Sequence, residues 1–401
     1  MTRPGASASP PSTDAAALEL PQQVAQWAAL SLHGLRSALF AAESLPLTWL
    51  QRPTSDHAQA APTRQALELT LSRLRALFEE DARQIGQGVI PFSVLAPRDA
   101  LRHGSRFLQI LGDARGVASR RKRRDARDFG AKAKSWLDGL PAYYRRNFHY
   151  QTDGYLSQRS AELYEHQVEM LFRGGADAMR RLILPPLRAH FGAEHDGQGL
   201  RLLEFGSGTG SATHAVARAF PRAKISCLDL SFPYTRHARQ QLSGYERVEC
   251  VQGDAAALEF GDGRFDAVYS VFLFHELPLP VREQVLAEAK RVLRPGGFFG
   301  LVDSLQKGDD PELDWALEFF PREFHEPFYA HYATHPMEAL ARAAGFESLR
   351  GGTGYLAKWL AARAPDDSSR APSSSRTPSV ARPRRPRKAV RSKVNPPNNP
   401  D

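Results

Sequence analysis

The sequence is poor in cysteine and has no long apolar run, and each shortage excludes a class of protein. Only two cysteines occur among 401 residues, Cys227 and Cys250. Because their spacing does not fit a metal site, we interpret them as reduced thiols of a cytoplasmic protein. No stretch reaches the roughly 18 consecutive apolar residues of a transmembrane helix. The N-terminus also lacks the basic start and apolar block of a secretion signal.

The net charge of the chain is low except at its C-terminal end. The net charge is +9, and residues 363–401 hold ten lysines and arginines against three aspartates, which accounts for +7. The remaining residues are therefore close to neutral, and the apolar fraction of 42% is enough for a sizeable core. We expect residues 363–401 to form a disordered basic tail, and residues 1–19 to form a disordered leader.

Residues 20–195 have helical periodicity, and we expect them to form a helical N-terminal region that caps the rest. Apolar residues recur at helical spacing between 20 and 50, and again between 64 and 86. The first stripe consists of Val24, Trp27, Leu32, Leu35 and Leu39. It indicates either packing on the body or a partner helix, or a helix that lies on a membrane surface, although few cations support the latter.

Two clusters stand out within this region. Residues 120–124 form a basic block, which is either a nucleic-acid patch or a solvated surface. Further along, aromatic residues are mixed with polar ones, a combination typical of a pocket wall but also compatible with plain inter-domain packing. They are Tyr143, Tyr144, Phe148, His149, Tyr150, Tyr155 and Tyr164, with Gln151, Asp153, Gln167 and Glu169 beside them.

Residues 196–362 alternate between strand and helix patterns. Strands are expected at 201–205, 224–229, 247–252, 265–271 and 297–303, with helices at 211–220, 233–243, 281–293 and 335–344. A loop is expected at 304–333. Residues 346–361, which include Gly351 and Gly352, fit a closing β-hairpin. This order predicts an α/β domain with a Rossmann-like, doubly wound, mostly parallel seven-stranded sheet and a closing antiparallel hairpin.

The most informative stretch joins the first expected strand to the first helix of this domain. Residues 201–210 read Arg-Leu-Leu-Glu-Phe-Gly-Ser-Gly-Thr-Gly. A glycine turn between strand and helix lets the backbone touch a ligand, because no Cβ intervenes. The dinucleotide fingerprint would need glycine or alanine at Ser211, so that match fails. The pattern that fits is Glu-x-Gly-x-Gly-x-Gly, from Glu204 to Gly210.

Carboxylates follow the next two strands. Ligands of doubly wound sheets bind outside the carboxyl ends of the strands. Asp229 ends the second strand, nineteen residues after Gly210, where a carboxylate can accept hydrogen bonds from both ribose hydroxyls. Asp254 ends the third strand and can accept from an adenine amino group. Either aspartate could instead be a helix cap.

Taken together, these motifs resemble the class I S-adenosylmethionine (SAM)-dependent methyltransferases over residues 200–361. The similarity is greatest to the branch that includes the ubiquinone and menaquinone biosynthesis enzymes. It implies SAM as cofactor and methyl donor, with a small molecule as acceptor. It also implies cofactor contacts from Glu204, Gly206, Ser207, Gly208, Gly210, Asp229, Leu230, Asp254 and Ala255. The long N-terminal region and the 304–333 loop depart from those enzymes, so the acceptor stays open.

Two His-Glu pairs are candidates for catalysis. His275-Glu276 follows the fourth strand, and His325-Glu326 lies in the 304–333 loop. We expect His275, or else His325, to orient or deprotonate the acceptor, because histidine accepts a proton near neutral pH. Glu326 or Glu276 would hold the ring. Either histidine could instead bond a loop carbonyl. No metal is expected, since adjacent His and Glu do not readily face one ion.

Three other functions remain open. A nicotinamide oxidoreductase would use the same fold, but the residue at Ser211 argues against it. The basic tail and the 120–124 block suggest a nucleic-acid (RNA) methyltransferase. However, the Asn/Asp-Pro-Pro-aromatic motif of base amino-group enzymes is replaced by residues 274–277, Phe-His-Glu-Leu. A non-catalytic SAM-binding protein is the third alternative. The sequence leaves the oligomeric state open.

Overall fold

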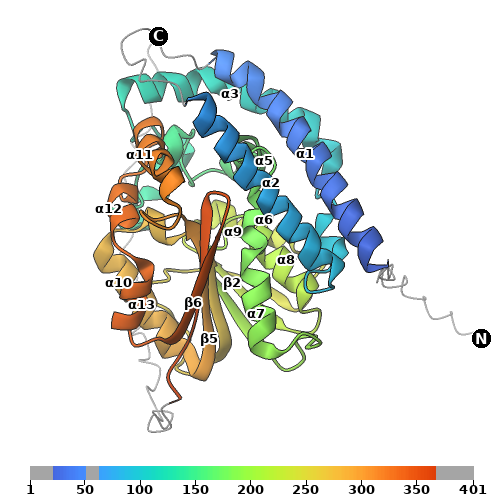
Figure 1. Cartoon of the computed structure of the whole chain (residues 1–401). Coiled ribbons are helices and arrows are strands. Elements are labelled where there is room, and N and C mark those ends of the chain that lie inside the picture. Colours follow the sequence, from blue (N-terminus) through green and yellow to red (C-terminus); the bar gives the residue numbers. More distant parts are fainter. Residues whose placement is uncertain (1–20, 51–62, 367–401) are drawn as a thin grey trace, which may run out of the picture. The chain divides into compact units, whose positions relative to one another are not determined.

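A computed structural model describes residues 21–50 and 63–366, and these belong to one compact unit that extends to Asp367 (Figure 1). The leader expected at 1–19 lies outside the described residues, as do residues 367–401 of the basic tail expected at 363–401. The first residue of that expected tail, Arg363, instead ends a strand, and Ala364 is buried. No helix in the described ranges is long and apolar enough to cross a membrane.

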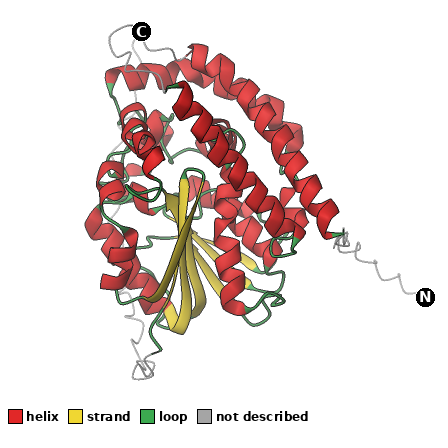
Figure 2. Cartoon of the chain, viewed as in Figure 1, coloured by secondary structure: helices red, strands yellow, loops and turns green. Residues whose placement is uncertain are grey.

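The centre of this unit is a sheet with helices around it (Figure 2). The sheet has seven strands in the order β3-β2-β1-β4-β5-β7-β6. The strands are β1 (Arg201–Phe205), β2 (Lys224–Asp229), β3 (Val248–Gln252), β4 (Phe265–Val271), β5 (Leu293–Ser304), β6 (Glu347–Gly354) and β7 (Ala357–Arg363). The first five pair in parallel, whereas β7 pairs antiparallel with both β5 and β6. The predicted fold class is confirmed. The strand order reverses between β1 and β4, so their carboxyl ends open a crevice at that point.

Helices cover both faces of the sheet. One apolar core joins β1, β4 and β5 to α8 (Ser211–Ala219) and α7 (Leu184–Phe191). A second core joins the opposite face to α10 (Leu279–Val292) and α13 (Met337–Ala343). Helix α9 (Phe232–Gln241) packs against β2 and β3 through a small cluster that contains both cysteines, which are free thiols. The central strands are buried on both faces, as parallel strands flanked by helices must be.

The N-terminal region is helical, as predicted. Its elements are α1 (Gln22–Leu50), α2 (Arg64–Gly86), η1 (Phe92–Leu95), η2 (Ala100–Arg102), α3 (His103–Arg123), α4 (Ala131–Lys134), η3 (Leu137–Gly139), η4 (Phe148–Tyr150), α5 (Gln158–Leu171), α6 (Ala176–Arg180) and η5 (Arg181–Ile183). Helices α1 and α2 lie side by side (Figure 1). Apolar residues of α2 enter the first core of the sheet, so the two regions share buried surface.

The apolar stripe predicted on α1 does not pack against the rest of the described chain, which contradicts packing on the body and leaves the partner-helix and membrane-surface interpretations untested. Trp27 and Leu35 are 71% and 70% exposed, and the other three residues of the stripe are exposed as well. The buried face instead contains Ala25, Ala29 and His33. Small side chains let α1 approach α2 closely, and His33 finds a buried carboxylate there, Asp81. A polar contact thus replaced the expected apolar one.

The segment after β5 contains helices where a loop was expected. It holds η7 (Pro311–Leu313), α11 (Asp314–Glu323) and α12 (Tyr329–Thr334), while η6 (Phe274–Glu276) follows β4. The closing hairpin is present, but Gly351 and Gly352 lie inside β6 and the turn falls at Tyr355 and Leu356. Proline within α11, at Pro321, obscured its helical pattern in the sequence.

Candidate cofactor and acceptor site

A single cavity of about 550 Å³ opens at the carboxyl ends of the parallel strands. One end is lined by the glycine loop after β1 and by the turns after β2 and β3. The other end is lined by side chains of α3, α5 and α11 and by the aromatic cluster between residues 143 and 164. The cavity therefore joins the expected cofactor site to the helical N-terminal region.

The glycine loop turns with three left-handed residues, Gly206, Gly208 and Gly210, whose φ values are +62°, +55° and +85°. A Cβ on Gly206 or Gly210 would meet a leucine side chain at 2.9 or 2.7 Å, so these two glycines are needed by the fold. A Cβ on Gly208 would meet nothing within 4 Å, and this residue lines the cavity. Gly208 is thus the point at which the backbone is open to a ligand.

Asp229 ends β2 directly beside this loop. Its Oδ2 accepts a hydrogen bond from the Gly208 amide at 2.8 Å, and its Oδ1 accepts one from the Ser231 amide at 2.8 Å. Burial raises the pKa of Asp229 to about 6, against the opposing effect of these two bonds. Each carboxylate oxygen retains a second lone pair, so the residue can still accept from a diol in the cavity.

The other expected cofactor residues lie around the same end of the cavity. Ser207, Leu230, Asp254 and Ala255 all line it. Asp254 also accepts a hydrogen bond from the Ala256 amide at 2.8 Å, so it both shapes its turn and faces the site. The fold therefore places residues from three strand ends, all of them predicted from the sequence, around one cavity.

Glu204 lines the cavity but lies deep beneath the loop. Its carboxyl accepts hydrogen bonds from the Thr213 hydroxyl and from the Tyr269 hydroxyl, the latter at 3.1 Å. Burial raises the pKa of Glu204 to about 8, so the group is largely uncharged at neutral pH. A neutral carboxyl at this place can donate as well as accept a hydrogen bond.

Aromatic and polar residues of the helical region line the acceptor end of the cavity. They are Tyr143, Tyr144, His149, Gln151, Tyr155, Tyr164 and Gln167. Tyr155 lies among other rings, stacked on Phe148 at 5.4 Å between centroids and edge-on to Tyr234 at 5.3 Å. Apolar side chains complete this wall, among them Ile110, Val168 and Leu317. The acceptor end is therefore suited to a molecule with a largely apolar body.

His275 lines the cavity in the turn that follows β4. Its Nδ1 lies 2.6 Å from Oδ1 of Asp303, the penultimate residue of β5. The partner is therefore Asp303 rather than the expected Glu276 or Glu326. Burial alone would lower the pKa of His275, but the Asp303 carboxylate outweighs it and raises the pKa to about 9. At neutral pH the ring is thus a cation and a donor.

The second histidine that lines the cavity is His149 and not the predicted His325. Its Nε2 lies 3.0 Å from Oε1 of Glu326 and 3.7 Å from Oε1 of Glu276. The Tyr155 hydroxyl donates to Glu276 in turn. Burial would lower the pKa of His149, but Glu326 and Glu276 raise it, while burial raises the pKa of Glu326 to about 7. This group can therefore exchange a proton near neutral pH.

His325 does not line the cavity. Its ring is tilted against Tyr150 at 5.7 Å, and its backbone carbonyl accepts a hydrogen bond from the His149 amide at 3.3 Å. Burial lowers the pKa of His325 to about 4. His149 was overlooked as a reactive group because it lies far from the strand ends in the sequence. Its positive φ of 55° was not readable from the sequence.

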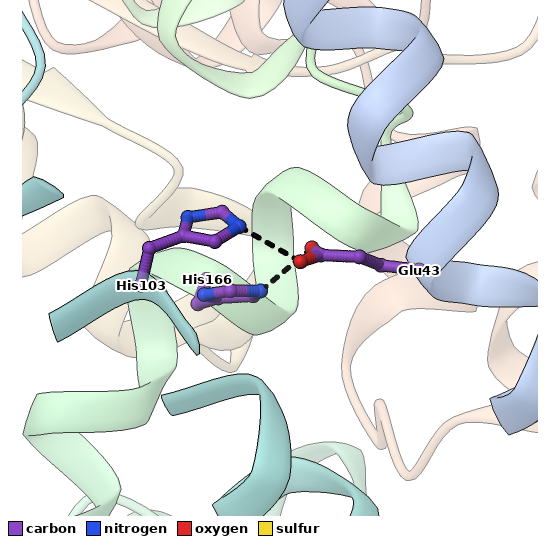
Figure 3. Close-up of side chains that lie close together, drawn as sticks. All are labelled: Glu43, His103 and His166. Atoms are coloured by element: carbon purple, nitrogen blue, oxygen red, sulfur yellow. Dashed lines mark hydrogen bonds and ion pairs between the residues drawn. The ribbon is translucent and has the colours of Figure 1, made fainter. Parts of the chain in front are cut away.

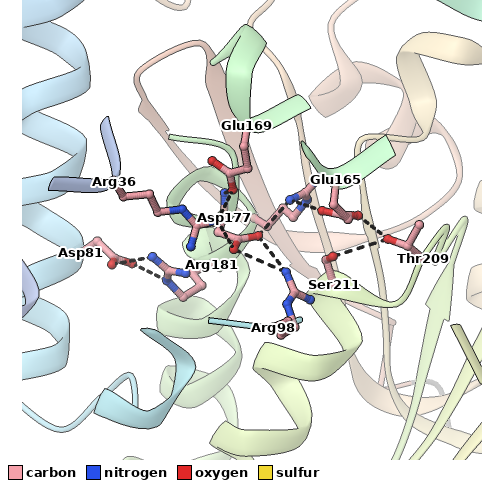
Figure 4. Close-up of polar contacts among 10 residues, drawn as sticks. Arg36, Asp81, Arg98, Glu165, Glu169, Asp177, Arg181, Thr209 and Ser211 are labelled. Atoms are coloured by element: carbon pink, nitrogen blue, oxygen red, sulfur yellow. Dashed lines mark hydrogen bonds and ion pairs between the residues drawn. The ribbon is translucent and has the colours of Figure 1, made fainter. Parts of the chain in front are cut away.

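A buried network of charges joins the helical region to the glycine loop (Figure 4). Glu165 of α5 accepts from the Thr209 hydroxyl and pairs with Arg180 at 2.8 Å. Asp177 next to it pairs with arginines from three parts of the chain, namely Arg36, Arg98 and Arg180. A network of this kind positions the loop through Thr209. Sequence analysis missed it because its members are widely spaced and none forms a local motif.

The basic block at 120–124 is not a continuous charged surface. Arg120 is buried and donates to the Tyr150 carbonyl at 2.8 Å and to the Thr152 hydroxyl. The guanidinium of Arg121 lies over the Phe324 ring at 5.5 Å and pairs with Glu323 at 3.6 Å. These two arginines hold the aromatic segment and α11 in place, whereas Lys122, Arg123 and Arg124 are exposed.

The chain is similar to known methyltransferases. Residues 202–297 match the family described as "Methyltransferase domain". The fatty-acid O-methyltransferase of Mycolicibacterium smegmatis is 36% identical over 160 residues, which cover 40% of this chain and 52% of that protein. The malonyl-[acyl-carrier protein] O-methyltransferase of Geobacter sulfurreducens is 33% identical over 153 residues, covering 37% and 56%. A ubiquinone/menaquinone biosynthesis C-methyltransferase of Ruegeria is 32% identical over 115 residues, covering 28% and 45%.

The chain therefore carries a methyltransferase domain of the class I, SAM-dependent type, as its sequence predicted. It spans about half the length of the curated relatives that it matches. The family match extends from β1 to the start of β5 and includes the glycine loop, and it does not reach the helical N-terminal region.

Proposed function

We propose that this protein transfers a methyl group from SAM to a small acceptor with an apolar body, in the cytoplasm. The observation that carries the proposal is the single cavity, which has the glycine loop and Asp229 at one end and an aromatic, apolar wall at the other. The three relatives described above are named as O- and C-methyltransferases of small or carrier-bound molecules, which supports the same class of reaction.

The residues present fit the cofactor. Gly208 leaves open the space that a Cβ would fill, Asp229 offers lone pairs to ribose hydroxyls, and Asp254 faces the same end. When bound, SAM supplies a methyl group on a good leaving group, so the protein needs mainly to align the acceptor and exclude water. The rings at Tyr144, Tyr155 and Tyr164 exclude water from the acceptor end.

Proton handling is assigned to two groups. The His275 cation, held by Asp303, orients an acceptor oxygen or other anionic group by donating a hydrogen bond. The group of His149, Glu276 and Glu326 accepts a proton when the acceptor must lose one. His325 has no part in this scheme because it does not reach the cavity.

The test is to incubate the purified chain with methyl-labelled SAM and a metabolite extract and to identify the labelled product. We expect label in small molecules that partition into organic solvent. Label in RNA would instead support the nucleic-acid alternative, for which the buried Arg120 gives no support. SAM binding measured by calorimetry without any labelled product across extracts would favour a non-catalytic role.

The catalytic assignment has its own test. His275→Ala should leave SAM affinity near normal and lower turnover about a hundredfold or more. His325→Ala serves as the matched control, because it lies outside the cavity and should retain turnover within a few-fold. Equal turnover in both variants would remove His275 from the mechanism.

A further inference from the structure

Three side chains that do not line the cavity meet within the helical region (Figure 3). They are Glu43 of α1, His103 at the start of α3 and His166 of α5. Nε2 of His103 lies 2.7 Å from Oε1 of Glu43, and Nε2 of His166 lies 2.9 Å from Oε2. The ligand atoms of all three residues fall within 4.8 Å of one another. Both imidazoles thus present the same nitrogen to one carboxylate.

Aromatic packing holds the two rings in this arrangement. Phe40, one turn before Glu43 on α1, is edge-on to His166 at 5.4 Å and tilted against His103 at 5.7 Å. Phe107 stacks on the other side of His166 at 6.3 Å. The His103 and His166 rings are themselves 4.5 Å apart. The donor atoms are therefore fixed before any ligand arrives, as a binding site requires.

The carboxylate lacks a permanent positive partner. Glu43 is only 10% exposed, and within residues 21–50 and 63–366 it pairs with no lysine or arginine. Arg106, one turn into α3, is engaged by Asp99 at 2.8 Å instead. A buried carboxylate is costly unless a cation or a donor compensates it. The two imidazoles offer donors, and a metal ion would offer full compensation.

We propose that Glu43, His103 and His166 bind a divalent first-row transition metal, of which Zn²⁺ is the representative. Two imidazole nitrogens and one carboxylate oxygen are a ligand set of such ions, whereas Mg²⁺ and Ca²⁺ take oxygen ligands. Bonds of about 2.0–2.2 Å at the tetrahedral angle place neighbouring ligand atoms about 3.3–3.6 Å apart. The observed 2.7 and 2.9 Å therefore need to widen by about 0.4–0.9 Å.

Exposure indicates where the site opens. His166 is 3% exposed in its side chain and Glu43 10%, whereas His103 is 32% exposed. The ion would enter on the His103 side and keep its remaining coordination positions toward solvent there. By joining α1, α3 and α5 the ion would fix these helices relative to one another. Ser44, which follows Glu43, and Glu165 and Gln167, which flank His166, line the cavity.

The test uses the full chain without an affinity tag, stripped with chelator and titrated with Co²⁺ as a spectroscopic probe. We expect one Co²⁺ per chain at this site, with visible d–d absorption that Zn²⁺ abolishes by displacement. Glu43→Gln and His166→Asn should each weaken binding at least about tenfold, since loss of even a supporting contact has an effect of that size. His190→Asn, a half-buried histidine on α7, is the matched control and should bind normally.

Several outcomes would overturn the proposal. The proposal is wrong if the folded wild-type chain does not bind Co²⁺, or if both variants bind Co²⁺ as tightly as the wild-type chain. If Co²⁺ binding persists in both variants, the ion is assigned to the group of His149, Glu276 and Glu326 instead. If the variants fail to fold, X-ray absorption on the Zn²⁺-loaded wild-type chain decides, and a spectrum without scattering from two imidazoles refutes the site.

Discussion

Gly208→Ala and Gly210→Ala form a pair of substitutions that separates ligand contact from folding. Both glycines have positive φ, +55° and +85°, so a side chain adds about 1–2 kcal/mol of backbone strain at either position. At Gly210 the new Cβ would also meet Leu242 Cδ1 at 2.7 Å inside the core, which adds about 1–3 kcal/mol of overpacking. At Gly208 it would meet no protein atom within 4 Å.

The expected results for the pair therefore differ. Gly210→Ala should lose about 2–5 kcal/mol of unfolding free energy in total, measured by denaturant titration. Gly208→Ala should lose no more than about 2 kcal/mol, but its SAM affinity, measured by calorimetry, should fall at least about tenfold. The bulkier Gly208→Val should bind still more weakly, because the side chain grows into the cavity.

Two results would contradict these expectations for Gly208 and Gly210. If folded Gly208→Ala and Gly208→Val both bind SAM within about threefold of the wild-type chain, the ligand does not lie against this part of the loop. If Gly210→Ala is as stable as Gly208→Ala, the contact with Leu242 relaxes without cost. In that case the 2.7 Å approach is not a constraint on the fold.

Two pH titrations and four further substitutions are expected to have measurable effects. SAM affinity should fall about tenfold between pH 7 and pH 5, because Asp229 with a pKa of about 6 becomes protonated there, and Asp229→Asn should abolish that dependence. Turnover should fall as pH rises through about 9, when the His275 cation is lost, and Asp303→Asn should move this limb toward lower pH. Asp81→Ala should cost about 3–5 kcal/mol of stability, since it leaves a buried arginine unpaired. Glu68→Ala, which breaks an exposed pair, should cost less than about 1 kcal/mol.

The sequence alone determined the sheet and the cofactor end of the cavity. Strand β1 lies at the predicted residues 201–205, and β2 and β4 also match their predicted ranges. These segments are readable because a buried parallel strand is a short apolar run, and the turn after it needs glycine for local steric reasons. The three strand ends meet because parallel topology forces their carboxyl ends to one edge of the sheet. Local patterns were sufficient for that inference.

Only the tertiary structure decided the acceptor end and the charge pairings. His149 reaches Glu326 across more than 170 positions of sequence, and Asp303 rather than Glu276 holds His275. The face of α1 that packs on the body contains His33, which contacts the Asp81 carboxylate, and the apolar periodicity did not identify this face. Such contacts depend on which elements pack together, and a buried charge must find its partner wherever the fold supplies one. No local spacing contains that information.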